Sequence, residues 1–208
     1  MNKYILISIN PEYVKDILNG NKILELRKTM PKCALPIDVY IYCTQSNKYL
    51  LDHNLDGWFC WDKQSKEYKV FNDFFKFNEL FNGHVVAKFT LNKVEKIPYK
   101  LYPSKSYLSA DEYDIQFNYY KDIMKKACIE KNKFIYYQNK DDLYGWYINN
   151  LHVFVTPLNL RDFYKSCKDY YGGFSGCDEY CGSAENGECL GGKYPINVPP
   201  MSWQFVYK

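Results

Sequence analysis

Hydrophobic and polar residues alternate with a period of two along much of this chain, and such alternation predicts short β-strands. The alternating stretches predict strands over residues 23–27, 37–44 and 84–91. Further strands are predicted over residues 4–9, 134–137, 143–148, 152–155 and 202–207. The strand that begins at His84 is expected to continue toward Ile97 and to end at Pro98. Short strands interspersed with a few helices predict an α+β fold class.

The segment after the first predicted strand is predicted to be a helix. Asn10 can cap its N-terminus, and Pro11 suits the first helical position. Its buried side would carry apolar residues three and four apart, namely Tyr13, Val14, Ile17 and Leu18. Asn19-Gly20 is expected to end the helix, because glycine readily takes the left-handed conformation there.

A second helix is predicted to begin after Ser109, which forms a capping-box pattern with Glu112. Its buried stripe would consist of Tyr113, Phe117, Tyr120, Met124 and Ala127. The lysines on its other positions, Lys121, Lys125 and Lys126, suit either a solvated face or a row of phosphate contacts.

The segment from about residue 45 to 82 has no regular pattern but is rich in aromatic residues, especially between Val70 and Phe81. One interpretation is a hairpin and a short helix packed over the core, and the other is a flap that binds a partner. Asp56-Gly57 is a plausible turn within it. We treat this segment as an aromatic insertion.

The composition fits one domain over residues 1–208, with 47% hydrophobic residues to build a core. The net charge of +3 is too small to indicate a nucleic-acid-binding protein by itself, so any anion site must be local. No apolar run is long enough for a transmembrane helix, and the first residues do not resemble a signal peptide. We therefore expect a cytoplasmic protein, with no membrane partner, in a reducing compartment.

Four of the eight cysteines lie close together in a glycine-rich segment over residues 167–192. These are Cys167, Cys177, Cys181 and Cys189. Four thiolates can bind zinc tetrahedrally, and the pair Cys177-x3-Cys181 has a spacing typical of zinc ligands. Four sulfur ligands leave no open position, so the predicted zinc is structural rather than catalytic. Free thiols and disulfides are the alternatives, and a reducing cytosol disfavours disulfides.

The polar residues of the segment from Gly20 to Arg27 are the strongest candidates for a functional site. Lys22 lies in the turn before the strand, and Glu25 and Arg27 share one strand face because they are two residues apart. Together these charges can bind a phosphate or polarise a carbonyl. The alternative is a solvated strand edge with a surface salt bridge.

The pattern Gly20-x-Lys22-x-x-Glu25-x-Arg27 resembles the signature of the ASCH domain, a branch of the PUA-like superfamily. Three further segments resemble this family in the same order. They are the first strand with its helix entry at residues 5–11, the Gly-Trp-x-Ile strand at residues 144–148 and the closing Pro-Pro-x-Ser-Trp at residues 199–203. The late strand and the cysteine segment resemble those of phage-type members. The closing segment has Met201 where the family usually has Gln.

The resemblance implies a PUA-like mixed β-pseudobarrel with flanking helices and a small Cys-rich insertion. It also implies a cleft beside the Lys-Glu-Arg strand that accommodates RNA or nucleotide-like ligands. Lys22 and Arg27 would contact phosphate or a base carbonyl, and Glu25 would orient Arg27 or accept a hydrogen bond from a base amine. Candidates for further contacts in the cleft are Ser8, Trp146 and Trp203, and the two tryptophans are equally compatible with core packing.

Two other function classes remain open. Some ASCH members resemble amidohydrolases that deacylate N4-acetylcytidine, but these have a threonine where this chain has Glu25, which counts against that activity. A ribonuclease on the same cleft would use Lys22, Glu25 and Arg27 on the scissile phosphate. The third class is a protein–protein interaction module that uses the aromatic insertion and the cysteine segment.

Overall fold

The computed structural model describes residues 3–75, 80–99, 110–166, 184–185, 188–189 and 193–208. The four helices of this part are α1 (Pro11–Leu18), α2 (Lys66–Phe75), α3 (Ala110–Lys126) and α4 (Lys131–Gln138), and a short 3₁₀ turn spans Leu160–Asp162. The longer strands are β1 (Lys3–Ile9), β2 (Leu24–Arg27), β3 (Ile37–Cys43), β4 (Tyr49–Asn54), β5 (Gly57–Asp62), β6 (Val85–Leu91), β7 (Val94–Ile97), β8 (Leu143–Tyr147), β9 (Asn149–Leu158) and β14 (Trp203–Tyr207). The short strands are β10 (Tyr164–Ser166), β11 (Ala184–Glu185), β12 (Glu188–Cys189) and β13 (Lys193–Pro195). The predicted mixed α+β class is confirmed.

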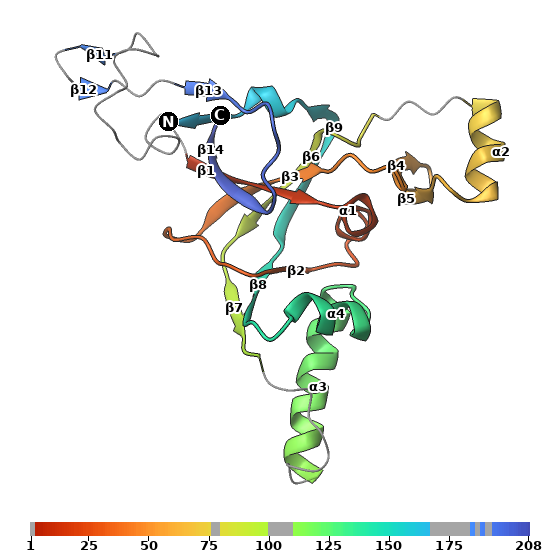
Figure 1. The fold of residues 1–208 in the computed structure, drawn as a ribbon, viewed down its shortest axis with the longest axis vertical. Coiled ribbons are helices and arrows are strands. Elements are labelled where there is room, and N and C mark those ends of the chain that lie inside the picture. Colours follow the sequence, from red (N-terminus) through yellow and green to blue (C-terminus); the bar gives the residue numbers. More distant parts are fainter. Residues whose placement is uncertain (1–2, 76–79, 100–109, 167–183, 186–187, 190–192) are drawn as a thin grey trace.

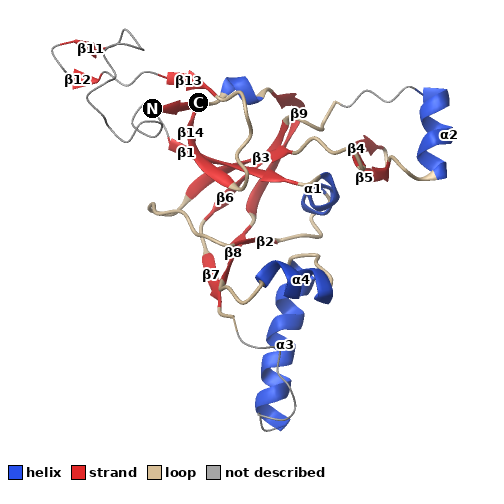
Figure 2. Cartoon of the chain, viewed as in Figure 1, coloured by secondary structure: helices blue, strands red, loops and turns tan. Residues whose placement is uncertain are grey.

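The largest layer is a seven-stranded sheet with the order β13-β10-β14-β1-β3-β6-β9 (Figure 2). Its central strand β1 pairs in parallel with β3 and antiparallel with β14. Because β14 is the last strand of the chain, the two termini lie side by side (Figure 1). A separate three-stranded sheet has the order β2-β8-β7.

One bent hairpin contributes strands to both sheets. β6 ends at Leu91 and β7 begins at Val94, while β8 ends at Tyr147 and β9 begins at Asn149. β6 pairs with β9 in the large sheet, and β7 pairs with β8 in the small one. The strand predicted to run continuously toward Ile97 is therefore interrupted, and this interruption lets the small sheet lie against the core instead of extending the large sheet.

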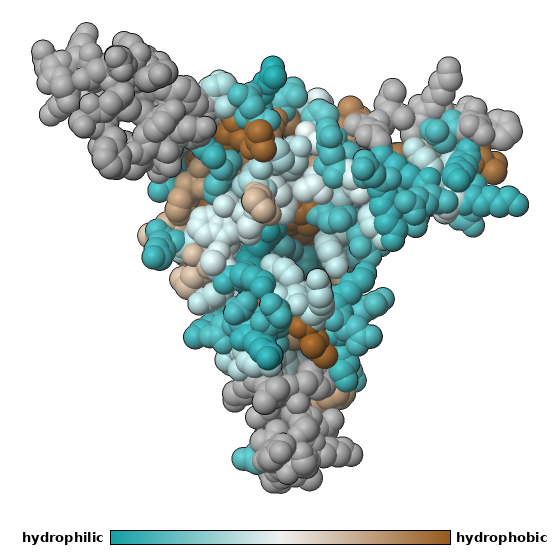
Figure 3. All heavy atoms as spheres, in the orientation of Figure 1, coloured by the Kyte–Doolittle hydropathy of each residue, from teal (hydrophilic) through white to brown (hydrophobic). Residues whose placement is uncertain are grey.

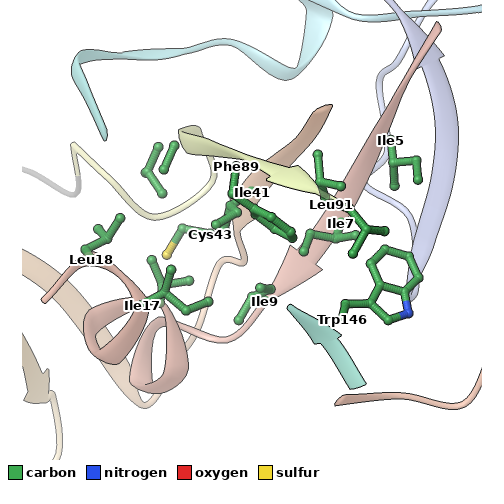
Figure 4. Close-up of a cluster of buried hydrophobic side chains, with 14 of the residues drawn as sticks. Ile5, Ile7, Ile9, Ile17, Leu18, Ile41, Cys43, Phe89, Leu91 and Trp146 are labelled. Atoms are coloured by element: carbon green, nitrogen blue, oxygen red, sulfur yellow. The ribbon is translucent and has the colours of Figure 1, made fainter. Parts of the chain in front are cut away.

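The main hydrophobic core lies between β1, β3, β6 and α1. It contains the inward-facing residues of the strands, such as Ile5, Ile7 and Phe89, which alternate with residues of the opposite face. α1 adds its predicted apolar side, with Ile17 and Leu18 at one end of the cluster and the indole of Trp146 at the other (Figure 4).

The predicted boundaries of α1 are confirmed by its capping contacts. The side chain of Asn10 accepts a hydrogen bond from the backbone N–H of Glu12 at 3.2 Å, and Pro11 occupies the first turn. The backbone of Gly20 has a φ of 74°, in the left-handed region that glycine adopts without strain. The turn after the helix therefore delivers the chain into β2 where the sequence placed it.

A second core lies between the small sheet and helices α3 and α4. It contains Leu24 and Leu26 of β2, together with Tyr120 of α3, Ala127 directly after α3 and Phe134 of α4. Tyr120 and Ala127 belong to the stripe predicted for α3, and this stripe also includes Ile123. Ser109 and the capping box that it was predicted to form lie outside the described residues.

The prediction of a strand over residues 134–137 is wrong, because these residues belong to helix α4. Phe134 and Gln138, one helical turn apart, are its buried residues. The run Phe134 to Tyr137 is continuously apolar or aromatic, and periodicity alone does not separate a helix from a strand in such a short run. Asn139, with a φ of 44°, ends the helix in the left-handed conformation.

The strand predicted over residues 152–155 is longer in the structure, where β9 extends to Leu158 and includes Pro157. β9 is the last strand of the large sheet. A proline is tolerated there because an edge strand leaves some N–H groups without a ladder partner. Thr156-Pro157 therefore does not close this strand as expected.

The aromatic insertion contains the hairpin and the short helix that were predicted as one alternative. β4 and β5 pair around a turn at Leu55-Asp56, one residue before the predicted Asp56-Gly57 turn, and α2 follows. The side chain of Asn19 donates to the carbonyl of Trp58 at 2.9 Å and accepts from its N–H at 3.0 Å, which fixes the hairpin to the end of α1. α2 itself lies away from the two cores (Figure 1).

On the face shown in Figure 3, hydrophilic side chains predominate over α1, the β4–β5 hairpin and α4, and the hydrophobic patches are small and separate. Among the described residues, no helix has the length and hydrophobicity needed to cross a membrane.

Candidate functional site

The site begins with the two faces of β2. Leu24 and Leu26 point into the second core, and Glu25 and Arg27 point to the opposite face. The predicted alternation is thus confirmed, but the polar face is also buried. Lys22, Glu25 and Arg27 are only 4%, 7% and 6% exposed, so they do not form the solvated strand edge that the sequence left open.

Lys22, Glu25 and Arg27 form a buried ion triad with Glu25 at its centre. Arg27 Nη2 lies 2.9 Å from Glu25 Oε1, and Lys22 Nζ lies 3.3 Å from Glu25 Oε2. Lys22 Nζ also donates to the backbone carbonyl of Ala127 at 2.7 Å, at the end of α3. Two cations around one carboxylate leave a net charge of +1 in a site with little water, where electrostatic interactions are strong.

Arg27 connects β2 to the ends of β1 and β14. Its Nη1 donates to the carbonyl of Ser202 at 3.1 Å and to Ser202 Oγ at 3.3 Å, and its Nη2 donates to the carbonyl of Ser8 at 3.0 Å. Together with the ion pair to Glu25, these hydrogen bonds engage both terminal nitrogens of the guanidinium group, Nη1 and Nη2. The sequence analysis predicted that Arg27 contacts phosphate or a base carbonyl, and in this arrangement its two terminal nitrogens are not available for a bidentate contact with a phosphate.

Two buried polar atoms beside the triad have no hydrogen-bond partner in the protein. They are Ser8 Oγ and Arg27 Nε. Buried polar groups are nearly always paired, because an unpaired one costs about 1–3 kcal/mol. Both residues also line the cavity described next.

The triad lines a cavity of about 360 Å³, which we call the triad cavity. Its lining comes from the end of β1, the start of α1, β2 with the turn before it, the segment between α3 and α4, and α4 itself. The lining residues are Ser8, Ile9, Asn10, Tyr13, Lys22, Glu25, Leu26, Arg27, Ile129, Lys133, Tyr136 and Tyr137. Four of the six predicted ligand-binding residues, Ser8, Lys22, Glu25 and Arg27, are thus brought together.

The sequence analysis missed the aromatic wall of the triad cavity, which α1 and α4 provide. Burial raises the pKa of both Tyr13 and Tyr137, although Lys133 opposes this effect at Tyr13 and Arg27 opposes it at Tyr137. Both phenols therefore stay protonated at neutral pH, and Tyr137 donates to the carbonyl of Leu26 at 3.3 Å. The missed signal was the helical spacing of Lys133 and Tyr137, four residues apart, because residues 134–137 were assigned to a strand.

Trp146 and Trp203 lie outside the lining of the triad cavity. Trp146 is fully buried in the main core, and its ring packs against Trp203 with the centroids 5.7 Å apart. Trp203 Nε1 donates to Thr29 Oγ1 at 2.9 Å. Of the two roles that the sequence allowed for Trp146, this placement corresponds to core packing rather than ligand stacking.

The cysteine cluster falls almost entirely outside the described residues. Cys167, Cys177 and Cys181 lie there, and Cys189 is described only as part of the backbone of β12. Within the part of the chain that the structure describes, no group of three or more His, Cys, Asp or Glu residues could bind a metal ion. The zinc site therefore stays a prediction.

Comparisons with known proteins give neighbours in structure but none in sequence. No family model matches this chain, and no curated protein matches it. Among solved structures, ASCH from Zymomonas mobilis is 14% identical with a TM-score of 0.49, over 99% of this chain and 88% of that chain. Two single-residue variants of that protein have the same identity, TM-score and coverage of this chain, and 91% and 89% of their own chains are covered. The resemblance to the ASCH family therefore rests on the four sequence motifs.

Proposed function

We propose that this protein is an ASCH domain with a PUA-like pseudobarrel, and that it binds RNA or a modified nucleotide with one nucleoside unit in the triad cavity. The observation that carries the proposal is a cavity of about 360 Å³ whose lining combines the buried ion triad with three tyrosines. Such a combination of aromatic surface and a few fixed polar groups is typical of small-molecule sites.

The size and lining of the triad cavity suit a nucleobase. A volume of about 360 Å³ lies at the lower end of the usual range for small-molecule sites. The rings of Tyr13, Tyr136 and Tyr137 form an aromatic wall. Each of the nucleobases can stack on such a ring, so this wall would select little between them. The cavity can therefore accommodate the flat apolar faces of a base together with its polar edge.

The polar groups in the cavity match the edge of a base that carries both carbonyl and N–H groups. Lys22 Nζ has three N–H groups, of which Ala127 and Glu25 take two, so one is left to donate to a base carbonyl. The hydroxyl of Ser8 can donate or accept, and Glu25 can accept from a base N–H. Arg27 in this proposal positions Glu25 and the ends of β1 and β14, rather than contacting phosphate.

The substitution Ser8→Ala tests the proposal without disturbing the fold. It removes a buried hydroxyl that has no protein partner, so we expect the free energy of unfolding to stay the same or to rise by up to about 1 kcal/mol. The affinity for nucleotide should fall by about tenfold, because one hydrogen bond to the ligand is lost. Thermal unfolding and titration with the four ribonucleoside 5′-monophosphates and with short single-stranded RNA measure the two effects.

A control variant, Tyr119→Phe, removes a hydroxyl that donates to Glu95 at 2.9 Å, away from the triad cavity. We expect this variant to keep its nucleotide affinity. If Ser8→Ala and Tyr119→Phe bind every nucleotide and RNA as the wild type does, or if the wild type binds none, the proposal is refuted. Denaturing gels of the same RNA separate binding from hydrolysis, because a nuclease would shorten the RNA and a binding module leaves it intact.

We also propose that Cys167, Cys177, Cys181 and Cys189 bind one structural zinc ion. The support is their clustering within a glycine-rich segment that has few apolar residues to form a core of its own. Elemental analysis of protein purified without added metal should find about one zinc per chain, and Cys177→Ser should lower this ratio. Cys33→Ser is a matched control outside the cluster. A ratio well below one in the wild type would contradict the zinc site.

The cytoplasmic location and the phage-type origin remain expectations from sequence alone. A protein–protein interaction module remains an alternative, since Val70 and Phe71 of α2 are 49% and 42% exposed. Deletion of the aromatic insertion would abolish the function of such a module, whereas Ser8→Ala would not affect it.

A further inference from the structure

A second hollow, of about 370 Å³, adjoins the triad cavity and shares Ile129 with it. It lies between the end of α3 and the start of α4, and three lysines line it: Lys121, Lys125 and Lys131. Met124, Cys128 and Glu130 complete its lining. We call it the lysine hollow.

We propose that the lysine hollow binds the sugar-phosphate backbone of nucleotides that flank the one in the triad cavity. This inference rests on the function proposed above and makes its ligand a single-stranded nucleic acid of several nucleotides rather than a free nucleoside. The sequence left open whether the lysines of α3 form a solvated face or contact phosphates. Their position around a hollow that continues from the triad cavity favours phosphate contacts.

The charges of the two hollows differ in a way that fits the base of one nucleotide and the phosphate backbone of its neighbours. In the triad cavity, the cations Lys22 and Arg27 are buried and paired with Glu25, so they suit the neutral edge of a base. In the lysine hollow, Lys121, Lys125 and Lys131 are exposed to solvent. Exposed lysines release counterions when they meet phosphates, which is the main source of affinity for a nucleic-acid backbone.

The spacing of two of these lysines also suits a row of phosphates. Lys121 and Lys125 are four residues apart on α3, so their side chains lie on one helix face about 6 Å apart along the axis. Lys133 of α4 lines the triad cavity itself, where it forms an ion pair with Glu12 at 3.2 Å. Lysines thus line both hollows, which share Ile129 where α4 lies across the end of α3 (Figure 1).

Glu130 allows a test in which a substitution is expected to strengthen binding rather than weaken it. It is the only acidic residue in the lining of the lysine hollow, as far as the described residues go, and it would repel a phosphate. Its side chain makes no capping hydrogen bond to α4, so Glu130→Gln should leave the helix intact. Neutralising Glu130 should therefore strengthen the binding of a nucleic-acid backbone.

The experiment uses the full-length protein and compares its affinity for mononucleotides with its affinity for oligonucleotides. Uridine 5′-monophosphate and adenosine 5′-monophosphate are titrated beside hexauridylate and hexaadenylate, over a series of salt concentrations. The wild type should bind the hexanucleotides at least tenfold more tightly than the mononucleotides. The double variant Lys121→Ala/Lys125→Ala should lose about tenfold for the hexanucleotides only, and the slope of log K against log salt should fall by about 1.4.

Two further variants complete the design. Glu130→Gln should raise the affinity for the hexanucleotides several-fold and leave that for the mononucleotides unchanged. Lys69→Ala, an exposed lysine on α2, should change neither. Equal binding of hexanucleotides by the wild type and the double variant would overturn the lysine-hollow proposal, and so would equally strong competition by hexaglutamate.

The two proposals fail in different ways. If Ser8→Ala weakens the binding of mononucleotides but the double variant does not change that of hexanucleotides, only the lysine hollow is refuted. If Ser8→Ala changes the affinity neither for mononucleotides nor for hexanucleotides, the triad cavity is not the nucleotide site. The lysine-hollow proposal is then refuted as well, because it depends on that site. If no nucleotide or oligonucleotide binds, both are overturned.

Discussion

Replacing Arg27 with alanine should lower the free energy of unfolding by about 3–5 kcal/mol, the range for removing one partner of a buried ion pair. Arg27 contacts Glu25, the carbonyl of Ser8 and both oxygens of Ser202. Without the guanidinium, the carbonyl of Ser8 and the two oxygens of Ser202 each lose a donor, and Glu25 keeps only Lys22 as its counter-charge. Chemical denaturation of the variant and the wild type measures the difference.

The adjacent residue provides a matched control for Arg27. Lys28 forms an ion pair with Asp141, but both side chains are largely exposed, at 45% and 61%. Lys28→Ala should therefore cost no more than about 1 kcal/mol. Arg27→Lys should give an intermediate loss, because it keeps the charge but not the fork that reaches two strands. A loss below about 1 kcal/mol for Arg27→Ala would show that Arg27 does not connect β2 to the large sheet.

Replacing Trp146 with alanine should lower the free energy of unfolding by about 3–5 kcal/mol, as is typical for large aromatic side chains in a core. The indole is fully buried among the residues of the main core and packs against Trp203. Its Nε1 has no protein partner, so Trp146→Phe loses packing but no hydrogen bond and should cost less. Thermal and chemical unfolding of both variants test this order.

A comparison with Tyr136 separates packing from ligand stacking. Tyr136 lines the triad cavity and is 88% exposed. Tyr136→Ala should change stability by no more than about 0.5 kcal/mol but weaken nucleotide binding by about tenfold. Trp146→Phe should do the reverse, with lower stability and unchanged binding. Weaker binding by Trp146→Phe at full stability would instead assign ligand stacking to Trp146.

The burial of the triad explains how one motif can serve both the fold and the site. Removing two cations and a carboxylate from water is costly, and their mutual attraction offsets this cost only when the remaining donors find acceptors. Here the acceptors are backbone carbonyls from α3, β1 and the segment before β14. Substitutions of Lys22 or Arg27 will therefore change stability together with binding, which makes Ser8 the more informative position for a functional test.

Several features of the protein followed from the sequence alone because they depend on neighbouring residues. The helix Pro11–Leu18 was predicted from Asn10, Pro11 and Gly20, which act within one turn of it. The alternation of β2 placed Leu24 and Leu26 opposite Glu25 and Arg27, because successive strand residues always face opposite ways. The motif from Lys22 to Arg27 was predicted to be a site from its residue types and from its resemblance to the ASCH signature, and Ser8 was predicted as a contact in the cleft that this resemblance implies.

Other features were decided only by the tertiary structure. The sequence did not show that both faces of β2 are buried, because this depends on α3 and α4 packing on one side and β1 with the segment before β14 on the other. Residues 134–137 form a helix because Phe134 reaches the second core and Tyr137 reaches β2, contacts with residues distant in sequence. The triad cavity, its aromatic wall and the lysine hollow all depend on the position of α4. Local sequence patterns thus determined which residues share a face of an element, while contacts between distant segments determined what each face packs against.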